Sequence, residues 1–493
     1  MAVIKVDLER VVGDVDRRLL GGFTEHMGRG VYGGVFDEGS PLADAEGYRT
    51  DVLEAVRRLR PPVLRWPGGN FVSGYHWADG IGPRDARPRR MDLAWHVEEP
   101  NRFGTDEFMR FCELVGAEPY VCLNMGTGTI DEAQAWVEYC NGTGGTYWAN
   151  LRRANGHEAP YGVRYWGLGN EMYGTWQIGQ QSAEDYVKNA RQWAKVLTWT
   201  DPSIELVSCG ETGWSDWDQV VIEGLAEFVR WHSLHIYTGS EDYWRDVLGP
   251  HQVERAARIT SALIEKARYN QHITHPIHIA YDEWNVWFRE QDGRAELEEH
   301  YTLADAIAVA TYLHAFVRHA QVVKMANLAQ LVNVIAPIVT SPDGLFLQSI
   351  YHPLRLFADH MGDEALDVYV ECDRHELTDP PAGERWPYRV ADLGPFPVLD
   401  VVVTRSKRNR KIMLSVINRS PDQDVTTELS FAGWLPASRA RVEEVNGADW
   451  KTTNSFTDPE LVKVAEGTIG TFESGIKHIF PAHSLTVISV ECE

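Results

Sequence analysis

With 493 residues, the chain is long enough for one large domain with an extensive core and a smaller second domain. Its formal net charge of −24 argues against nucleic acid or an anionic membrane as a partner, because like charges repel, whereas a neutral ligand is compatible with it. The 6 cysteines are scattered without a C-x-x-C pair and fit neither a disulfide framework nor a zinc site, while the 18 tryptophans supply flat rings that suit both cores and sugar pockets.

The first element in chain order is a strand in residues 1–17, "AVIKVDL", and this stretch lacks the long apolar region of a secretory signal. We expect the strand to join the C-terminal domain described below, as an edge strand. The most apolar stretch of the chain, "LAQLVNVIAPIV", is too short and too polar to cross a bilayer. These features predict a cytoplasmic protein with no membrane partner.

Residues 18–360 alternate short apolar runs with longer amphipathic ones. The amphipathic runs predict helices, one of which starts with Thr105 as its N-cap and stops at Gly116, and others over residues 183–199, 251–268 and 302–320. Eight apolar strands alternating with helices are typical of a parallel (β/α)8 TIM barrel, because such strands are covered on both faces. The predicted strands span residues 21–25, 62–70, 118–124, 165–171, 205–210, 232–237, 277–283 and 323–330.

All but the fifth of these strands end on polar or ionisable side chains. In a β/α barrel the carboxyl ends of the strands converge on one rim, and that rim holds the chemistry. Polar residues there could also cap the following helices, which would explain Asn124 but explains Glu283 poorly. The predicted rim residues are Glu25, Asn70, Asn124, Asn170, Glu171, His235, Tyr237, Glu283 and Gln330.

After residue 360 the pattern changes to the period-two alternation of antiparallel strands. Residues 361–493 are therefore predicted to form a C-terminal antiparallel β-sandwich, with strands over residues 365–372, 398–406, 411–420, 424–431, 440–447 and 484–492. The basic cluster "RSKRNRK" at 405–411 lies between two of these strands. We interpret it as a solvated hairpin turn rather than a nucleic-acid site.

Two of the rim residues stand in stretches of similar design. "GLGNEMYGTWQIG" (167–179) and "IHIAYDEWNVW" (277–287) each lead from an apolar strand to a glutamate, Glu171 or Glu283, that is followed by tryptophan. Three β/α units separate the two strands, so the carboxylates are expected to face each other across the barrel mouth. Such a pair of acids in an apolar pocket suits glycoside hydrolysis. Burial and the nearby like charge keep one acid protonated, so it can give a proton to the leaving oxygen. The other acid stabilises the positively charged sugar or attacks it.

The chain resembles, over essentially its whole length, the α-L-arabinofuranosidases of glycoside hydrolase family fifty-one. The matching motifs, in order, are "GGFTEHMGRGVYGG", "VLRWPGGNFVSGYHW", "NRFGTDEF", "GLGNEM", "WQIG", "SLHIY", "DEWNVW" and "LAQLVNVIAPI". The resemblance implies a barrel with the catalytic acids on strands four and seven, a jelly-roll-like C-terminal domain and a retaining mechanism on terminal α-L-arabinofuranosyl residues of a small oligosaccharide. It also implies that no cofactor or metal is needed, and that the chain forms an intracellular homo-oligomer, with a hexamer suspected.

Carried onto this sequence, the resemblance makes Glu171 the general acid/base and Glu283 the nucleophile. Arg65 would lie behind Glu283 and hold it ionised, and Trp95 and Trp287 would wall the pocket. His235 is either a hydrogen-bonded residue of the barrel end or a direct sugar contact. The side chains that would bind the furanose hydroxyls are Glu25, Asn70, Asn170, Tyr237 and Gln330.

Three positions depart from the family pattern. The family usually reads Asn-Glu-Met-Asp-Gly, with proline next but one to that aspartate, whereas this chain has Tyr173 and Thr175; Pro100 stands where a threonine is usual. These changes leave both acids intact but leave the substrate open, so that a β-xyloside, a galactofuranoside or a β-glucan is an alternative to an arabinofuranoside. A catalytically inactive sugar-binding protein is a third interpretation, which the matched pair of acids disfavours.

Overall fold

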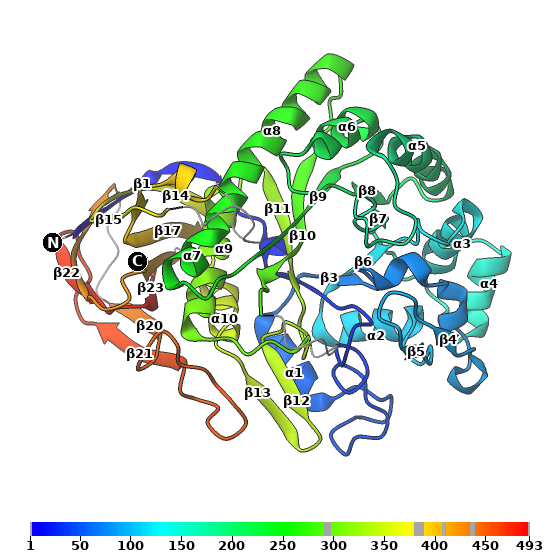
Figure 1. Ribbon diagram of the computed structural model, residues 1–493, viewed down its shortest axis with the longest axis horizontal. Coiled ribbons are helices and arrows are strands. Elements are labelled where there is room, and N and C mark those ends of the chain that lie inside the picture. Colours follow the sequence, from blue (N-terminus) through cyan, green and yellow to red (C-terminus); the bar gives the residue numbers. More distant parts are fainter. Residues whose placement is uncertain are drawn as a thin grey trace.

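Eight parallel strands close into a barrel, which confirms the predicted (β/α)8 architecture. The computed structural model describes residues 2–289, 297–378, 389–406, 408, 411–433 and 439–491. Each barrel strand overlaps one of the strands predicted from the sequence. The strands are β2 (Gly21–Phe23), β3 (Val63–Trp66), β6 (Glu118–Cys122), β7 (Tyr165–Leu168), β8 (Glu205–Ser208), β9 (Trp231–Thr238), β10 (His278–Val286) and β11 (Val323–Ala329) (Figure 1).

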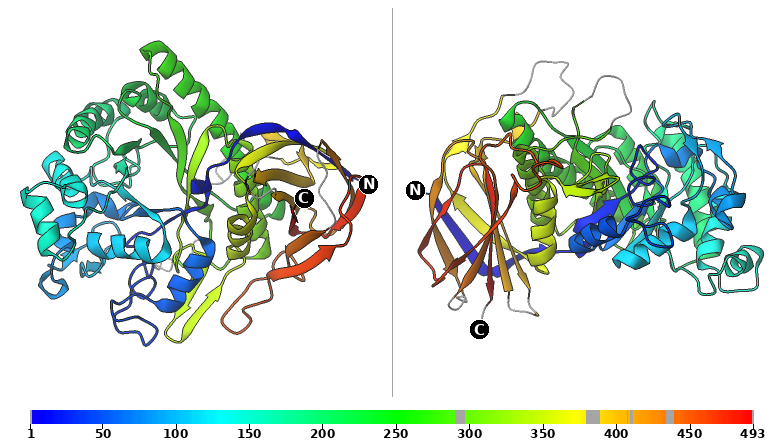
Figure 2. Two further views of the ribbon diagram at one scale, coloured as in Figure 1. Left: turned by 180° about the vertical axis from the view of Figure 1, so that it is seen from behind. Right: turned by 90° about the horizontal axis from the view of Figure 1, so that it is seen from below.

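Helices surround the barrel on its outer side, as the views in Figures 1 and 2 show. Strands such as β3 and β7 are buried along their whole length because side chains fill the barrel inside and helices cover it outside. The helices are α1 (Thr50–Leu59), α2 (Thr105–Val115), α3 (Ile130–Asn141), α4 (Tyr147–Ala154), α5 (Ala183–Thr200), α6 (Asp216–Leu225), α7 (Tyr243–Leu248), α8 (Gln252–Gln271), α9 (Leu303–Arg318) and α10 (Tyr351–His360).

Helix α2 begins one residue earlier than the sequence suggested. The N-cap is Gly104, whose backbone N–H donates to the Glu107 carboxylate at 2.9 Å, so the prediction of Thr105 as the cap is wrong. The Thr105 hydroxyl instead accepts a hydrogen bond from the Trp136 indole at 3.0 Å. The predicted end is confirmed, because Gly116 adopts a left-handed conformation with φ 79°, which glycine tolerates without steric cost.

Helix α9 joins the barrel to the C-terminal domain. Its sequence, "LADAIAVATYLHAFVR", is apolar almost all round, and every residue but Arg318 is buried. The Nε2 atom of His314 lies 2.8 Å from the Ser415 hydroxyl, and Arg318 donates to Asp400 at 2.6 Å. This helix therefore packs against both halves of the molecule and fixes them to each other.

The C-terminal domain is one nine-stranded sheet, antiparallel except for the pairing of β1 with β19. Side chains from strands far apart in the sheet, such as Leu429 and Val442, share one core, which requires the sheet to curl round on itself (Figure 2). Its strands, in sheet order, are β21 (Lys463–Ile469), β20 (Ala440–Asn446), β23 (Ser484–Glu491), β18 (Lys411–Asn418), β17 (Leu399–Ser406), β14 (Glu364–Glu371), β1 (Ala2–Asp14), β19 (Val425–Ala432) and β22 (Ile476–Phe480).

Two features of this sheet differ from the expectation. The N-terminal strand β1 is an interior strand, hydrogen-bonded to β14 on one side and β19 on the other, not an edge strand. Strands β21 and β22 were not anticipated, because they are the two edges of the sheet and their largely exposed side chains lack a buried apolar face. The remaining short strands are β4 (Arg90–Met91), β5 (Glu98–Glu99), β12 (Ile338–Ser341), β13 (Gly344–Leu347), β15 (Arg374–His375) and β16 (Phe396–Pro397).

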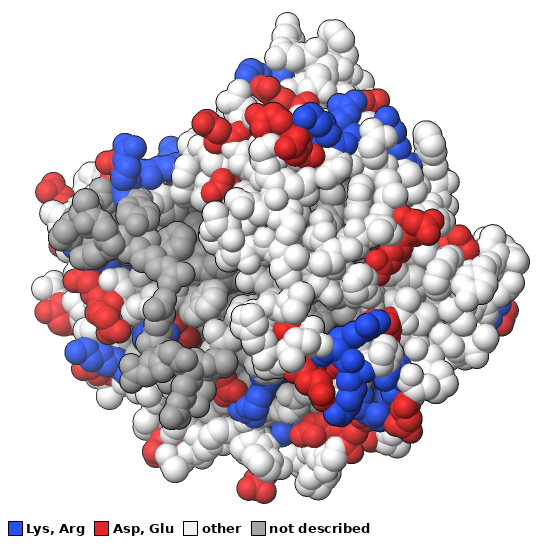
Figure 3. Space-filling model, turned by 45° about the vertical axis from the view of Figure 1, so that its right-hand side comes forward, with Lys and Arg blue, Asp and Glu red and all other residues white. Residues whose placement is uncertain are grey.

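The surface charge is distributed in small groups of both signs. On the face in Figure 3, Lys and Arg lie beside Asp and Glu, and a broad central area carries neither. The basic cluster connects two antiparallel strands, with Ser406 opposite Lys411, as a hairpin requires; residues 407, 409 and 410 lie outside the described residues. Among the helices that the structure describes, we find none with the length and apolar character needed to cross a bilayer.

Candidate active site

The two glutamates of the paired motifs meet at the rim of the barrel. One carboxylate oxygen of Glu171, one of Glu283 and a ring nitrogen of His235 all lie within 4.8 Å of one another. Inverting glycosidases need carboxyl groups about 6.5–9.5 Å apart to leave room for water, whereas retaining ones need about 5–5.5 Å. An upper bound of 4.8 Å between one oxygen of each acid is too short for the inverting arrangement and compatible with the retaining one.

Glu171 stands at a strained turn that follows β7. Gly169 and Glu171 both have positive φ, 81° and 42°, and the second value is rare for a residue with a side chain. Such a conformation costs about 1–3 kcal/mol and persists where the surrounding structure enforces it. Here that structure includes donors to the carboxylate, the Trp176 indole at 2.6 Å and the Tyr173 hydroxyl at 3.3 Å, with the Nδ1 atom of His235 at 2.9 Å.

Glu283 is held by an arginine and a tyrosine. Arg65, from β3, donates to Oε1 at 2.6 Å, and the Tyr237 hydroxyl, from β9, donates to Oε2 at 2.8 Å. The second guanidinium nitrogen of Arg65 reaches Asn170 at 2.7 Å and so ties the two acidic strands together. Arg65 is fully buried, which makes its contact with Glu283 much stronger than an ion pair in water.

A third carboxylate, Asp282, also faces the site, although neighbouring residues of a strand should point to opposite faces. Strand β10 departs from regular register between Ala280 and Glu283, and this bulge turns both acids inward. Asp282 accepts from the Tyr120 hydroxyl at 2.7 Å and lies 3.3 Å from the Nε2 atom of His235. Burial would raise the pKa of Asp282, but Arg65 and His235 hold it well below the usual range.

Glu25 forms a second polar group beside the acid pair. Its carboxylate accepts from the Trp95 indole and from the backbone N–H of Phe71, both at 3.0 Å, and Gln330 binds both its carboxylate and its backbone N–H. Burial, followed by repulsion from Glu283, raises the pKa of Glu25 to about 8. Near neutral pH this carboxyl can therefore donate as well as accept a hydrogen bond.

Three other predicted site residues, Trp287, Asn70 and Asn124, differ in whether their side chains already have hydrogen-bond or packing partners. Trp287 packs edge-to-face on Tyr237, with ring centroids 5.3 Å apart. The Asn70 amide makes no hydrogen bond within the described part of the chain and is partly exposed. Asn124, in contrast, accepts from the backbone N–H groups of Gly126 and Thr127 in its own loop; it does not cap the following helix α3, whose N-cap is Thr129.

The pKa of the predicted general acid, Glu171, is lowered, whereas the sequence led us to expect a raised pKa. Burial raises the pKa of Glu171, but the hydrogen bonds from His235, Trp176 and Tyr173 favour its ionised form and lower the pKa below the usual value. Burial lowers the pKa of His235, but Glu283, Asp282 and Glu171 raise it to about 10. In the unliganded site the proton shared by His235 and Glu171 therefore rests on His235.

Sequence reasoning missed three of the groups that surround the acids and their partner His235. Asp282 was visible beside Glu283, but strand periodicity places it on the opposite face. Trp176 was noted only as a tryptophan that follows Glu171, and Tyr173 only as a departure from the family pattern. The spacing of Tyr173 and Trp176, two and five residues after Glu171, could have signalled a turn that folds back on the carboxylate.

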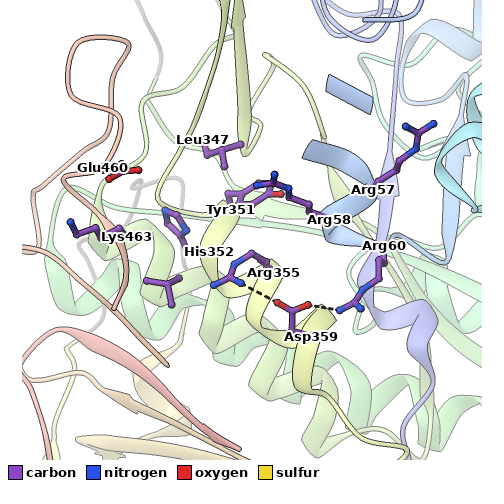
Figure 4. Close-up of a pocket in the computed structure, with 11 residues that line it drawn as sticks. Arg57, Arg58, Arg60, Leu347, Tyr351, His352, Arg355, Asp359, Glu460 and Lys463 are labelled. Atoms are coloured by element: carbon purple, nitrogen blue, oxygen red, sulfur yellow. Dashed lines mark hydrogen bonds and ion pairs between the residues drawn. The ribbon is translucent and has the colours of Figure 1, made fainter. Parts of the chain in front are cut away.

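Two other features resemble binding sites. The Glu171, Glu283 and His235 atoms are close enough to accept a metal ion, but each already binds a partner within the site. A cavity of about 720 Å³ lies between α1, α10 and the C-terminal domain (Figure 4). Its arginines Arg60 and Arg355 converge on Asp359 at 2.5 and 3.1 Å, so it is an ion-pair network without a facing pair of acids.

Two family models match the chain, the α-L-arabinofuranosidase 1 domain over residues 55–254 and the α-L-arabinofuranosidase C-terminal domain over residues 282–484. A probable α-L-arabinofuranosidase C from Aspergillus clavatus is 43% identical, over 99% of this chain and 97% of its own. The chain belongs to the α-L-arabinofuranosidases of glycoside hydrolase family fifty-one. It is therefore a glycoside hydrolase, as the paired acids predict.

Two further family members cover the whole chain. An intracellular exo-α-(1→5)-L-arabinofuranosidase 1 from Bacillus subtilis is 37% identical over 99% of this chain and 98% of its own. The crystal structure of an α-L-arabinofuranosidase from Thermotoga maritima in an arabinose complex superposes with a TM-score of 0.92 at 40% identity, over 100% of both chains. Barrel and C-terminal sheet thus occur together in this family.

Proposed function

We propose that the chain is an exo-acting, retaining α-L-arabinofuranosidase that removes terminal non-reducing α-L-arabinofuranosyl residues from small oligosaccharides by double displacement. The observation that carries the proposal is the approach of Glu171, Glu283 and His235 to within 4.8 Å at the rim of the barrel. The names of the Aspergillus and Bacillus relatives support arabinofuranoside as the sugar.

In the first step, a carboxylate oxygen of Glu283 attacks the anomeric carbon while the bond from that carbon to the leaving oxygen breaks. Glu171 gives a proton to the leaving oxygen and receives the proton that His235 holds 2.9 Å away. Glu283 is well prepared as the nucleophile, since Arg65 and Tyr237 fix both of its oxygens. The products are the free alcohol and a glycosyl ester of Glu283.

In the second step, Glu171 is ionised and acts as the general base. It takes a proton from water, whose oxygen attacks the anomeric carbon from the side that the leaving group vacated. The ester bond to Glu283 breaks, and the sugar leaves with its original configuration. The proton returns to the Glu171–His235 pair, which restores the starting state.

The polar groups around the acids suit a small neutral sugar. Glu25, with Gln330 and Trp95 around it, and the unoccupied amide of Asn70 offer both donors and acceptors for hydroxyl groups. Tyr237 and Trp287 provide adjoining aromatic faces. Localisation in the cytoplasm and assembly into a homo-oligomer remain part of the proposal, and the word intracellular in the Bacillus relative's name favours the former.

A panel of 4-nitrophenyl glycosides tests the substrate. Release from the α-L-arabinofuranoside, with little from the β-xyloside, β-galactofuranoside or β-glucoside, supports the proposal, whereas release from another glycoside alone moves the assignment to that sugar. Absence of turnover on every glycoside would support a sugar-binding protein instead. Proton NMR of the first-formed sugar shows whether the anomeric configuration is retained.

Two variants test the roles of the acids. Glu283→Ala should abolish turnover and recover with azide, giving a product of inverted configuration. Glu171→Ala should retain cleavage of activated aryl glycosides in the first step but slow the second, and azide should restore it with retained configuration. Glu98→Ala, which removes an exposed carboxylate, is the control. An unchanged rate and pH profile in Glu171→Ala would show that this residue is not the acid/base.

A further inference from the structure

We propose that Tyr173 is a positioning residue that biases the acid/base Glu171 toward its ionised form, and so favours the base-catalysed second step of the reaction. The inference rests on the proposed function, because it takes Glu171 as the acid/base. Tyr173 follows Glu171 by two residues in the turn after β7, and the proposal rests on the contact between these two side chains.

The contact is a hydroxyl aimed at the carboxylate and held by aromatic packing. The Tyr173 hydroxyl donates to Oε1 of Glu171 at 3.3 Å. Its ring meets Trp217 and Trp176 edge-to-face, with centroids 5.7 and 6.0 Å away, and Trp217 is a buried residue of α6. The hydroxyl is therefore positioned by the ring packing and not by the hydrogen bond alone.

The three donors to Glu171 differ in what else they do. Trp176 is 60% exposed and binds Oε2, so an arriving leaving group can compete for that oxygen. His235 is shared among Glu171, Asp282 and Glu283, and it carries the proton that the reaction moves. Among the described residues, the Tyr173 hydroxyl bonds Glu171 alone, so neither a leaving group nor the other acids compete for it in this structure.

The charged and titratable groups that face Glu171 come from three elements besides its own loop. They are His235 and Tyr237 on β9, Glu283 on β10, and Cys209 and Glu211 in the loop after β8. Two of them, Glu283 and Glu211, are carboxylic acids, so an aspartate at position 173 would add a third acidic group near Glu171 and favour its protonated form. Burial and the nearby Glu171 raise the pKa of Tyr173, which keeps it a neutral donor that favours the carboxylate.

The consequence appears in the second step, where Glu171 must be ionised. A hydrogen bond to the ionised form lowers the pKa of Glu171, so deglycosylation is retained to lower pH and is lost as pH falls through that pKa. Removing the Tyr173 hydroxyl raises the pKa of Glu171 and moves the acidic limb of the profile of kcat against pH to higher pH. We expect a move of about 1 pH unit in Tyr173→Phe, the lower end of what a hydrogen bond to a charge can give, because 3.3 Å is long.

The experiment measures kcat against pH on aryl α-L-arabinofuranosides under conditions where deglycosylation limits the rate, shown by equal kcat for two activated leaving groups. Tyr173→Phe keeps the ring and its packing, so a purely structural role would leave the acid limb in place. Tyr173→Asp should move it further in the same direction. Tyr269→Phe, at a tyrosine of α8 that is 82% exposed, is the matched control and should leave the profile unchanged.

The outcomes separate this inference from the proposed function. If Glu171→Ala removes the acid limb and Tyr173→Phe shifts it upward, both stand. If Glu171→Ala removes the limb but Tyr173→Phe leaves it where it was, the inference is overturned and the function remains. If Glu171→Ala leaves the limb unchanged, the acid/base assignment fails and the inference fails with it. Should Tyr173→Asp not fold, Tyr173→Phe alone decides.

Discussion

Replacing Arg65 with methionine should destabilise the protein far more than the loss of an ordinary ion pair. The guanidinium is fully buried and touches Glu283 at 2.6 Å, Asn170 at 2.7 Å and Asp282 at 3.5 Å. Removing one partner of a buried pair leaves an uncompensated charge and typically costs about 3–5 kcal/mol of unfolding free energy. Because two carboxylates lose their partner here, we expect Arg65→Met to fall in the upper part of that range.

The matched control is Arg10→Met. Arg10 pairs with Asp367 at a similar distance, 2.9 Å, but the two side chains are 70% and 42% exposed. Such surface pairs contribute about 0–1 kcal/mol, so this variant should unfold almost as the parent does. Urea unfolding at about pH 7, followed by tryptophan fluorescence, compares the two variants directly.

The pH dependence of the unfolding free energy provides a second test of Arg65→Met. Arg65 helps to depress the pKa of Asp282 in the folded protein, so this stabilisation is present above the ordinary carboxyl pKa and is lost as pH falls through the depressed value. Without Arg65, burial raises the pKa of Asp282. Protonation of Asp282 then removes the cost of its buried charge at a higher pH than in the parent. The gap between parent and Arg65→Met should therefore narrow as pH is lowered from about 7 toward 4. Equal stability of the Arg65 and Arg10 variants at neutral pH would refute the reasoning.

Two further predictions concern substrate binding and acid stability. Gly69→Ala should raise KM about tenfold with little change in kcat, because a Cβ at position 69 would collide with the Glu25 carboxylate and displace this sugar-binding group. Steady-state kinetics test this prediction. An unchanged KM would contradict a sugar contact by Glu25. Burial lowers the pKa of His352 to about 4, so the parent should lose about 3 kcal/mol as pH falls from about 6.5 to 4, while the unfolded state takes up a proton. His352→Gln should flatten this loss in urea titrations at several pH values, and an equally steep loss would exclude His352 as its source.

Much of the barrel could be predicted because its signals are local. Each strand is a short apolar run, and the polar residues at the strand ends, such as Glu25 and Gln330, follow directly in the sequence. Knowing that parallel strands share one rim was enough to bring these residues together. The same reasoning, applied to strands four and seven, predicts that Glu171 and Glu283 face each other across the barrel mouth.

What could not be predicted depends on backbone geometry outside regular structure. The bulge in β10 turns Asp282 toward the site, and no residue pattern marks it. The lowered pKa of Glu171 follows from a turn that brings Tyr173 and Trp176 back onto the carboxylate, whereas burial alone predicts the opposite direction. Edge strands such as β21 lack a buried face, so alternation could not reveal them.

The position of β1 sets an order of events during synthesis. Residues 2–14 leave the ribosome long before their two neighbours in the sheet, β14 and β19, which end at residues 371 and 432. At about 5–20 residues per second, the strand waits about 20–80 seconds for both partners, long enough for the barrel to fold beside it. Until then its apolar side chains depend on chaperones or on the nascent barrel for cover. A C-terminal fragment expressed alone would lack a central strand and expose two unpaired edges.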